Sequence, residues 1–499
     1  MEEFDWGKYL SHDRQRKEME SLGSSDDHRA CFESDLKRVL FCPALRRMHD
    51  KTQVIPLSNG DTLLTRLTHS MQVMGIAEML AISLTRNEDF SKKYKEKTAI
   101  YADSISAILR TASLIHDIGN PPFGHFGEVS IQNYFRRYLK SRHIITDEES
   151  LDFTEFDGNA LGLRIVSKLQ YTGTLDGLNL TYATLGAYLK YPNKGDCNPK
   201  GYVGCHKHGI FRSEYSLFDR IVDACNMKKE GGLIKRHPLS FLVEAADSIC
   251  YGIMDIEDGY NLNWYDFDTI VNFLDEFVEE HVEDKTYLNE ALVTKKLEGV
   301  EKKVFSIEKL IGFSRTWDDK EKGFPKDRRR VIIDFRDNLI DYLVKKTVSI
   351  FVENLHNIEE GMCEDELLHL DKLKVSKALS AFTKKYIISR RDIQQTELTG
   401  NSVITGLLDI LLRYSFHEEK KYRSKINAVI AKSRLEALIH EYKYPELTYN
   451  VFKERKDMWD FDIENLSPYS KLRVIVDFVG SMTDKYSVEL YQKLSGMRL

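Results

Sequence analysis

Two histidines and two aspartates stand out as possible ligands of a metal ion. They are His69 in RLTHSMQVMGIAEML, the pair His116-Asp117 in AILRTASLIHDIGNPPFGH, and Asp247 in LSFLVEAADSICYGIMDIEDG. Two imidazoles and two carboxylates make a nitrogen–oxygen ligand set for a divalent cation. Such a cation polarises a phosphoryl oxygen and lowers the pKa of a bound water. The set therefore predicts metal-dependent hydrolysis, with a phosphate ester as the expected substrate.

The His116-Asp117 pair follows a run of residues that is apolar enough to be buried. The run contains Ile105, Ile108, Leu109, Ala112, Leu114 and Ile115. Buried polar groups need partners, because leaving them unpaired is costly. A metal would satisfy both side chains, but a hydrogen-bonded pair in the core would satisfy them too. The dipeptide alone leaves both interpretations open.

The segment GNPPFGHFGE after this pair supports a site, because it is rich in residues that break helices and shape loops. We expect the next helix to begin around Gly127-Glu128. His125 and Glu128 are three residues apart, so both could face one cleft. Histidine is the usual general acid or base near neutral pH, and a neighbouring carboxylate can orient it. The alternative is a capped loop with a surface histidine and glutamate.

Asp247 is an acidic residue in an otherwise apolar stretch that predicts a packed helix. Tyr251 and Asp255 follow four and eight residues later, on roughly the same helical face. One face would thus offer a possible metal ligand, a phenol and a second carboxylate.

Together these motifs match the signature of the HD phosphohydrolase superfamily, and the wider matches resemble the deoxyguanosine triphosphate triphosphohydrolases (dGTPases). The matching segments are 38–54 (RVLFCPALRRMHDKTQV), 65–73, 114–128, 156–160 (FDGNA), 189–192 (LKYP), 244–258, 396–410 and 477–486. The resemblance runs from about residue 29 to the C-terminus. The stretches 141–155, 193–235 and 260–380 carry little signal.

The resemblance implies cleavage of a deoxynucleoside triphosphate, dGTP above all, into the deoxynucleoside and inorganic triphosphate. It implies that the four ligand candidates hold the metal and that His125 and Glu128 form a catalytic pair beside it. The positions that match substrate contacts are Gln53, Tyr251 and Asp255 for the deoxyribose, Lys190 and Tyr191 for the triphosphate, and Glu397 and Arg434 for the base and phosphate end of the site. Tyr251 would fill the space at the 2′ carbon and so select against ribonucleotides.

A triphosphate also needs cations that offset its negative charge. The candidates before His69 are Arg46, Arg47, Lys51 and Arg66. We take Arg46 as a substrate-binding candidate, and the alternative for Arg46-Arg47 is a solvated helix face.

Long stretches of the chain have helical periodicity, for instance 329–356, whereas strand-like alternation is scarce. The length of 499 residues would suit two or three domains, but no linker separates folding units. We therefore predict an all-α fold, a single large unit with an HD-domain helical core and additional helices. Residues 1–60 would contribute to the nucleotide site, 61–260 would form the metal-binding core, and 261–499 would complete the site.

The composition restricts the class of protein. A net charge of −6 argues against a generally basic nucleic-acid binder, although the resemblance leaves binding of single-stranded DNA possible. No apolar run is long enough to span a membrane, and the N-terminus lacks the apolar core of a signal peptide. Seven cysteines, an odd number, indicate reduced thiols and a cytoplasmic protein. The gap between Cys197 and Cys205 does not have zinc-finger spacing.

Two other functions stay open at this point. One is an HD phosphohydrolase that acts on another nucleotide, and the other is a nucleotide- or DNA-binding regulator with a degenerate site. The ligand set suits Mn or Mg and also accepts Fe, Co or Zn, so the native metal is not determined. The resemblance implies a homo-oligomer, often a hexamer.

Overall fold

The three helices that carry the ligand candidates form where the sequence predicts them. They are α3 (Arg66–Arg86), α5 (Thr98–Ile115) and α11 (Pro238–Asn261). A capping box formed by Thr65 and Thr68 begins α3. The imidazole of His237 accepts a hydrogen bond from the Leu239 N–H at the start of α11. Most of α11 is buried, so it is a core helix rather than a surface one.

The structure is a computed structural model that describes most of the chain. It describes residues 6–16, 29–51, 64–93, 98–170, 174–195, 201–229, 231–297, 300–314, 328–430, 432–443 and 463–497. Gln53 and Cys197 lie outside these ranges. The other helices are α1 (Arg29–Leu40), α2 (Pro43–Arg47), α4 (Glu88–Lys93), α6 (Gly124–Leu139), α7 (Asp147–Thr154), α8 (Gly158–Arg164), α9 (Tyr182–Tyr188), α10 (Tyr215–Ala224), α12 (Phe267–His281), α13 (Ile307–Leu310), α14 (Arg328–Glu353), α15 (Leu355–Glu360), α16 (Val375–Thr383), α17 (Arg391–Ser415), α18 (Lys420–Val429), α19 (Lys432–Lys443), α21 (Pro468–Gly480) and α22 (Asp484–Leu494).

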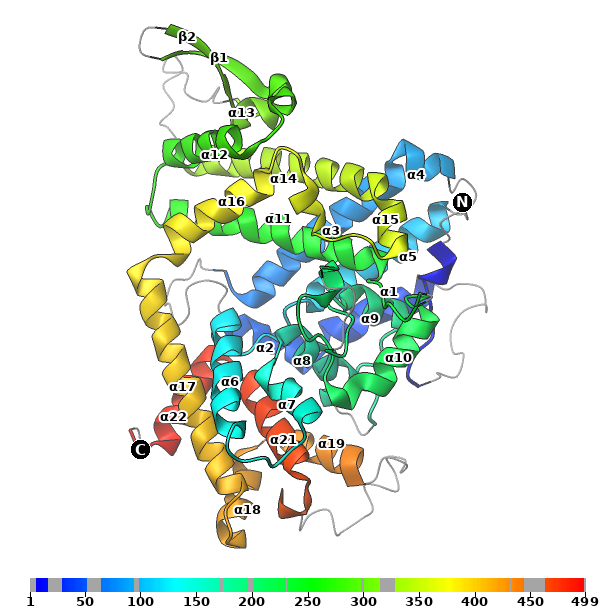
Figure 1. Cartoon of the computed structure of the whole chain (residues 1–499), viewed down its shortest axis with the longest axis vertical. Coiled ribbons are helices and arrows are strands. Elements are labelled where there is room, and N and C mark those ends of the chain that lie inside the picture. The colour runs from blue at the N-terminus through cyan, green and yellow to red at the C-terminus, as the bar shows by residue number, and fades with distance from the viewer. Residues whose placement is uncertain are drawn as a thin grey trace.

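These helices form one continuous apolar core, which confirms the predicted all-α single unit. In the core, α3 packs against both α5 and α11, and α14 lies across α3 and α11 (Figure 1). The long helix α17 packs against α6, α21 and α22 in the lower half of the same view. The candidate ligands are therefore held by helices that support one another.

A small β-hairpin is the main departure from the expected helices. Strand β1 (Leu292–Leu297) pairs antiparallel with β2 (Val300–Phe305). The hairpin projects from the helical body beside α12 (Figure 1). It lies in the stretch where the sequence carries little signal, because its lysine pairs interrupt the apolar–polar alternation of a strand.

Helix α6 begins at Gly124, earlier than the predicted start around Gly127-Glu128. The reason is a contact from the far end of the chain, since the Phe123 N–H donates to Asp484 Oδ1 at 2.9 Å. Phe123 and Gly124 both have positive φ, at 63° and 59°. A side chain at Gly124 would also meet the Arg66 guanidinium. The turn is thus closed by tertiary structure, which local sequence does not reveal.

The state of the cysteines differs in part from the prediction. The free thiols are Cys31, Cys42, Cys225, Cys250 and Cys363. Cys205 is disulfide-bonded, so the prediction of reduced thiols throughout is wrong. An odd number of cysteines leaves one unpaired, but it does not prevent a single pair from forming. Separately, none of the helices in the described ranges is long and apolar enough to cross a bilayer.

Candidate active site

The four predicted ligands meet at one place, although they come from α3, α11 and the turn that follows α5. The ligand atoms of His69, His116 and Asp117 all lie within 4.8 Å of one another. Asp247 reaches them from α11, with its Oδ1 3.0 Å from His69 Nε2 and 3.4 Å from His116 Nε2. His69 lies on the first turn of α3, and the His116-Asp117 pair directly follows α5. The structure brings the set together, and the role of its members as ligands stays a prediction.

The state of His116 fits a cation at this place. Its Nδ1 lies 2.7 Å from the Ser113 carbonyl oxygen and therefore carries the proton of that hydrogen bond. Nε2 is buried and makes no hydrogen bond of good geometry to the residues described, although Asp247 Oδ1 and Asp117 Oδ1 lie 3.4 and 3.5 Å from it. Buried polar atoms rarely lack a partner, and a hydrogen bond on the far nitrogen is typical of a metal-bound histidine. The donor set thus suits a divalent cation.

The charges around this group are strongly coupled. Burial works against the charged form of His116, but the carboxylates of Asp117 and Asp247 outweigh it and raise its pKa to about 9. Burial alone would raise the pKa of Asp117, but the charges of Arg66 and His116 lower it. The Arg66 guanidinium donates directly to Asp117 Oδ2, and Asn120 Nδ2 donates to Oδ1 at 2.6 Å. Arg66 and Asn120 therefore keep Asp117 ionised and oriented.

His125 and Glu128 form a hydrogen-bonded pair on the first turns of α6. His125 Nδ1 donates to Glu128 Oε2 at 2.9 Å, and this bond is the main cause that raises the pKa of His125. Glu128 Oε1 accepts from the Gly158 N–H at 2.7 Å. The Glu128 side chain is 6% exposed and that of His125 is 76% exposed. The buried carboxylate thus holds the imidazole so that its Nε2 is free.

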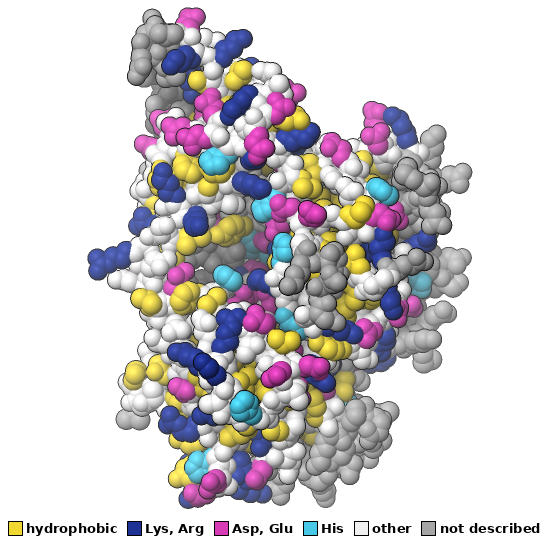
Figure 2. All heavy atoms as spheres, in the orientation of Figure 1, with side chains coloured by type: hydrophobic (Ala, Val, Ile, Leu, Met, Phe, Trp, Pro, Cys, Tyr) yellow, Lys and Arg dark blue, Asp and Glu magenta, His cyan; other side chains and the backbone are white. Residues whose placement is uncertain are grey.

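The glycine of the FDGNA motif, Gly158, is explained by its contact with Glu128 of the His125–Glu128 pair. A Cβ at Gly158 would lie 2.7 Å from Glu128 Oε1 and 2.5 Å from Asn120 Oδ1, closer than real Cβ atoms come. A glycine is therefore required for the backbone N–H to reach the Glu128 carboxylate. On the face shown in Figure 2, the surface is hollowed between α11 and α6, and acidic and histidine side chains lie beside the hollow.

The structure also contains the predicted face of α11, with Tyr251 and Asp255 one and two helical turns after Asp247. Tyr251 is partly buried, and Asp255 is buried. Asp255 Oδ2 has no hydrogen-bond partner within the part of the chain that is described. Burial and the charges of Asp258 and Asp247 raise the pKa of Asp255 well above its usual value. The Asp255 carboxyl can hydrogen-bond a hydroxyl group, as the predicted sugar contact requires.

Two lysines lie near the ring of Tyr191, and only Lys190 was predicted. Lys190 Nζ lies 5.6 Å from the centre of that ring and 3.0 Å from Glu244 Oε1. Lys207 Nζ lies 5.9 Å from the ring centre, 2.9 Å from Asp157 Oδ2 and 3.7 Å from Glu128 Oε2. Sequence reasoning missed Lys207, because it stands in a loop-like stretch without a motif. Its place beside Glu128 depends on tertiary contacts.

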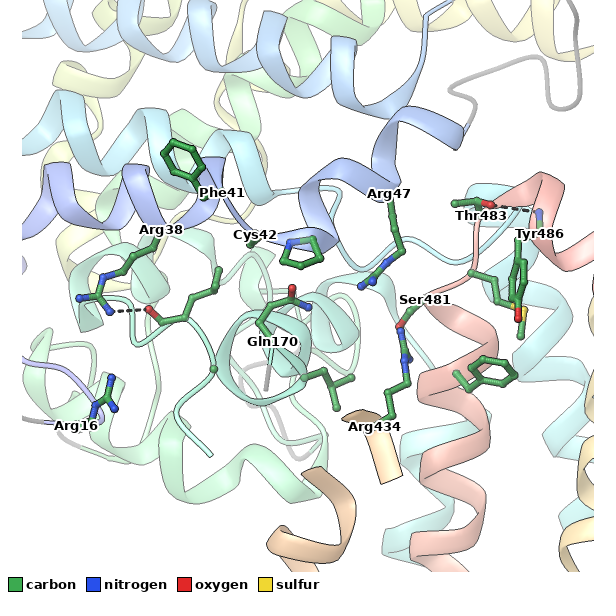
Figure 3. A pocket seen from close by; sticks show the side chains of 16 residues that line it. Arg16, Arg38, Phe41, Cys42, Arg47, Gln170, Arg434, Ser481, Thr483 and Tyr486 are labelled. Carbon is green, nitrogen blue, oxygen red and sulfur yellow. Dashed lines mark hydrogen bonds between the residues drawn. The ribbon is translucent and has the colours of Figure 1, made fainter. Parts of the chain in front are cut away.

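The three remaining substrate-binding candidates lie in different surroundings. Glu397 on α17 is close enough to His125 to interact with it electrostatically, while burial raises the pKa of Glu397. Arg46 is exposed at the end of α2. Arg434 on α19 lines a separate cavity that none of the four ligands lines (Figure 3). The structure thus brings Glu397 toward the catalytic pair but places Arg434 elsewhere, and their roles in binding substrate stay predictions.

Comparison with known proteins agrees with this geometry. A family model described as HD domain matches residues 66–170, the range that contains His69, His116-Asp117, His125 and Glu128. A deoxyguanosinetriphosphate triphosphohydrolase-like protein of Listeria innocua is 32% identical over 501 residues, covering 99% of each chain. Proteins of the same name are 28% identical over 509 residues in Synechocystis, covering 99% of this chain and 100% of the relative, and 29% identical over 507 residues in Pseudomonas aeruginosa, covering 99% of each.

The resemblance that the motifs indicated is therefore confirmed across the whole length of the protein. The chain belongs to the family of deoxyguanosinetriphosphate triphosphohydrolase-like proteins, and it is a phosphohydrolase with an HD domain.

Proposed function

We propose that this protein hydrolyses deoxynucleoside triphosphates, with dGTP preferred, to the deoxynucleoside and inorganic triphosphate. The observation that carries the proposal is the position of Lys207, whose ammonium lies 3.7 Å from the carboxylate that holds His125. With Lys190 also near the Tyr191 ring, the site has two cations for a phosphate chain next to an acid–base pair and a metal-type ligand group. The names of the full-length relatives support the same substrate.

In this proposal His69, His116, Asp117 and Asp247 hold a divalent cation, with Mn or Mg expected. When bound, the cation polarises the phosphoryl oxygen and makes water more acidic. Lys190 and Lys207 hold the triphosphate.

The hydrolysis itself breaks the ester bond of the α-phosphate. A water oxygen forms a bond to the α-phosphorus, and the bond from phosphorus to the deoxyribose 5′-oxygen breaks. His125 Nε2 takes the proton from water and delivers it to the leaving 5′-oxygen, while Glu128 holds Nδ1.

The experiment that tests this function is a panel of the four dNTPs and four NTPs, each with Mn and with Mg. The products are resolved as nucleoside with triphosphate, or as mono- and diphosphates. We expect deoxynucleoside and triphosphate in equal amounts. Release of a single phosphate, or turnover of nucleoside monophosphates only, would contradict the proposal and favour an HD phosphohydrolase for another nucleotide. No turnover of any nucleotide would favour a binding regulator.

A sugar preference follows from the face of α11. If the sugar lies across Tyr251 with its 3′-hydroxyl near Asp255, a ribose 2′-hydroxyl meets the ring and loses water without gaining a partner. An unpaired polar group costs about 1–3 kcal/mol. We therefore expect kcat/KM for dGTP to exceed that for GTP by at least ~10-fold, since about 1.4 kcal/mol is one decade.

Variants on this face separate the two contacts. Tyr251→Ala should lower the ratio of kcat/KM for dGTP to that for GTP, mainly because the variant admits GTP. Tyr251→Phe keeps the ring and should retain the ratio of the unmodified protein. Asp255→Ala should weaken dGTP without improving GTP. Equal use of GTP and dGTP by the unmodified protein would contradict this arrangement of the sugar.

The pH dependence of turnover should report on the bond between His125 and Glu128. That bond raises the pKa of His125, so Glu128→Gln, which removes the charge, should lower it. Whether turnover requires the neutral or the protonated imidazole, the limb of the pH profile that belongs to His125 should move to lower pH. The measurement is kcat against pH for both proteins. An unmoved limb would mean that another group controls it.

The proposal also includes the assembly, binding partner and location of the enzyme. We propose that it forms a homo-oligomer, such as a hexamer, binds single-stranded DNA and is located in the cytoplasm. Sedimentation of the full chain, with and without a single-stranded oligonucleotide, tests the first two.

A further inference from the structure

A cavity of about 580 Å³ is lined by none of the four metal-ligand candidates (Figure 3). Its walls come from α2, α21 and the start of α22, together with residues around 169–178. Four arginines line it, and they are Arg16, Arg38, Arg47 and Arg434. Among the described residues that line the cavity, none is acidic. Its volume is within the usual range for small-molecule sites, about 300–1,000 Å³.

Two of these arginines are close together and lack acidic partners. In Figure 3 the guanidinium groups of Arg47 and Arg434 approach each other from opposite walls. Arg434 donates to the Asp477 carbonyl oxygen and, at 3.0 Å, to Ser481 Oγ. Neither guanidinium forms an ion pair with a carboxylate in the described ranges. The other two differ, since Arg16 pairs with Asp176 at 2.9 Å and Arg38 donates to the Leu178 carbonyl oxygen at 3.1 Å.

Burial and mutual repulsion disfavour the two positive charges of Arg47 and Arg434. Burial and the positive charge of Arg47 lower the pKa of Arg434 to about 10. Burial also lowers the pKa of Arg47. Two neighbouring cations that lose water repel each other, and an anion between them removes both penalties. Guanidinium groups bind phosphate in a bidentate manner, as they do carboxylate, and a phosphate has enough oxygens to accept from both arginines at once.

The wall beside the two arginines is aromatic and apolar. Phe478 of α21, Met482 and Tyr486 of α22 all line the cavity. Tyr486 is 44% exposed, whereas Phe478 is buried. A flat apolar group could therefore lie against Tyr486 while its phosphate reaches Arg47 and Arg434.

We propose that this cavity binds a small phosphate ester with a flat aromatic group, its phosphate held by Arg47 and Arg434 and its ring against Tyr486 and Phe478. The site is separate from the metal group, because none of the four ligands, His125 or Glu128 lines the cavity. The proposal does not depend on the reaction at the metal group, and it assigns Arg434 to this second ligand.

The test uses phenylphosphonate, whose carbon–phosphorus bond a phosphoesterase does not cleave. Binding to the full-length protein is measured by calorimetry, and the ligand-induced rise in Tm is measured in parallel. We expect Arg47→Gln to weaken binding at least ~10-fold, the effect of losing a charge-assisted hydrogen bond. Because this substitution removes a repulsion, it should not lower the Tm of the free protein.

Matched variants make the result specific. Arg46→Gln changes the exposed neighbour on α2 and should leave the affinity unchanged. Asp247→Asn should also leave it unchanged, which separates this cavity from the metal group. Tyr486→Ala should reduce the advantage of phenylphosphonate over methylphosphonate. Equal binding by Arg47→Gln and the unmodified protein, or loss of binding in Asp247→Asn alone, would overturn the proposal, and neither result depends on turnover of a nucleotide.

Discussion

Replacing His125 with alanine should lower kcat by roughly 100- to 10,000-fold, the usual contribution of a general acid or base. Glu128 holds the imidazole through Nδ1, and the exposed Nε2 is the atom that can exchange a proton with a reacting group. Alanine removes that atom and leaves the four ligand candidates in place. The bound metal should therefore stay near the level of the unmodified protein.

The measurement is single-substrate kinetics with dGTP, together with metal analysis of the same preparations. His281→Ala is a matched control, because the imidazole of His281 stacks on Phe277 in α12 and belongs to no part of the candidate site. That control should retain normal kcat. If the metal is lost from the His125 variant, His125 is a ligand, and the division of roles between this pair and the ligand group is wrong.

The face of α11 and the pair on α6 could be predicted because their spacing is local. Asp247, Tyr251 and Asp255 are separated by single helical turns, and any helix places such residues in line. His125 and Glu128 are likewise three residues apart on α6. The family resemblance then supplied what local spacing does not, namely that α3, α5 and α11 would bring their ligands to one point.

The remaining parts depend on contacts between segments far apart in the chain. Helix α6 begins early because Asp484 closes the turn at Phe123. Lys207 reaches Glu128 from a loop whose sequence has no motif. Arg434 matched a substrate position, yet it forms hydrogen bonds at the end of α21 and lines the cavity that the metal-ligand candidates do not line. Such placements follow from packing, so residue types and spacing alone do not specify them.

The second large effect is expected for Asp247→Asn, which should lose bound metal and lower activity at least ~10-fold. Asp247 Oδ1 contacts both His69 Nε2 and His116 Nε2 and is thus the carboxylate that joins the two imidazoles. Asparagine keeps the shape of the side chain but removes its negative charge. Because the two histidines are neutral as ligands, losing one of two carboxylates halves the negative charge that balances a divalent cation.

Metal content per chain, measured by elemental analysis after dialysis, checks this directly, and dGTP turnover is measured on the same samples. Asp258→Asn is the matched control for metal content, since it makes the same change three turns further along α11 and should keep the metal. Its carboxyl already has a pKa raised by burial and by Glu257 to about 7, so its charge contributes less near neutral pH. Stoichiometric metal with normal turnover in Asp247→Asn would reject the four-residue ligand set, and the cation would then have to be held by His69, His116 and Asp117 alone.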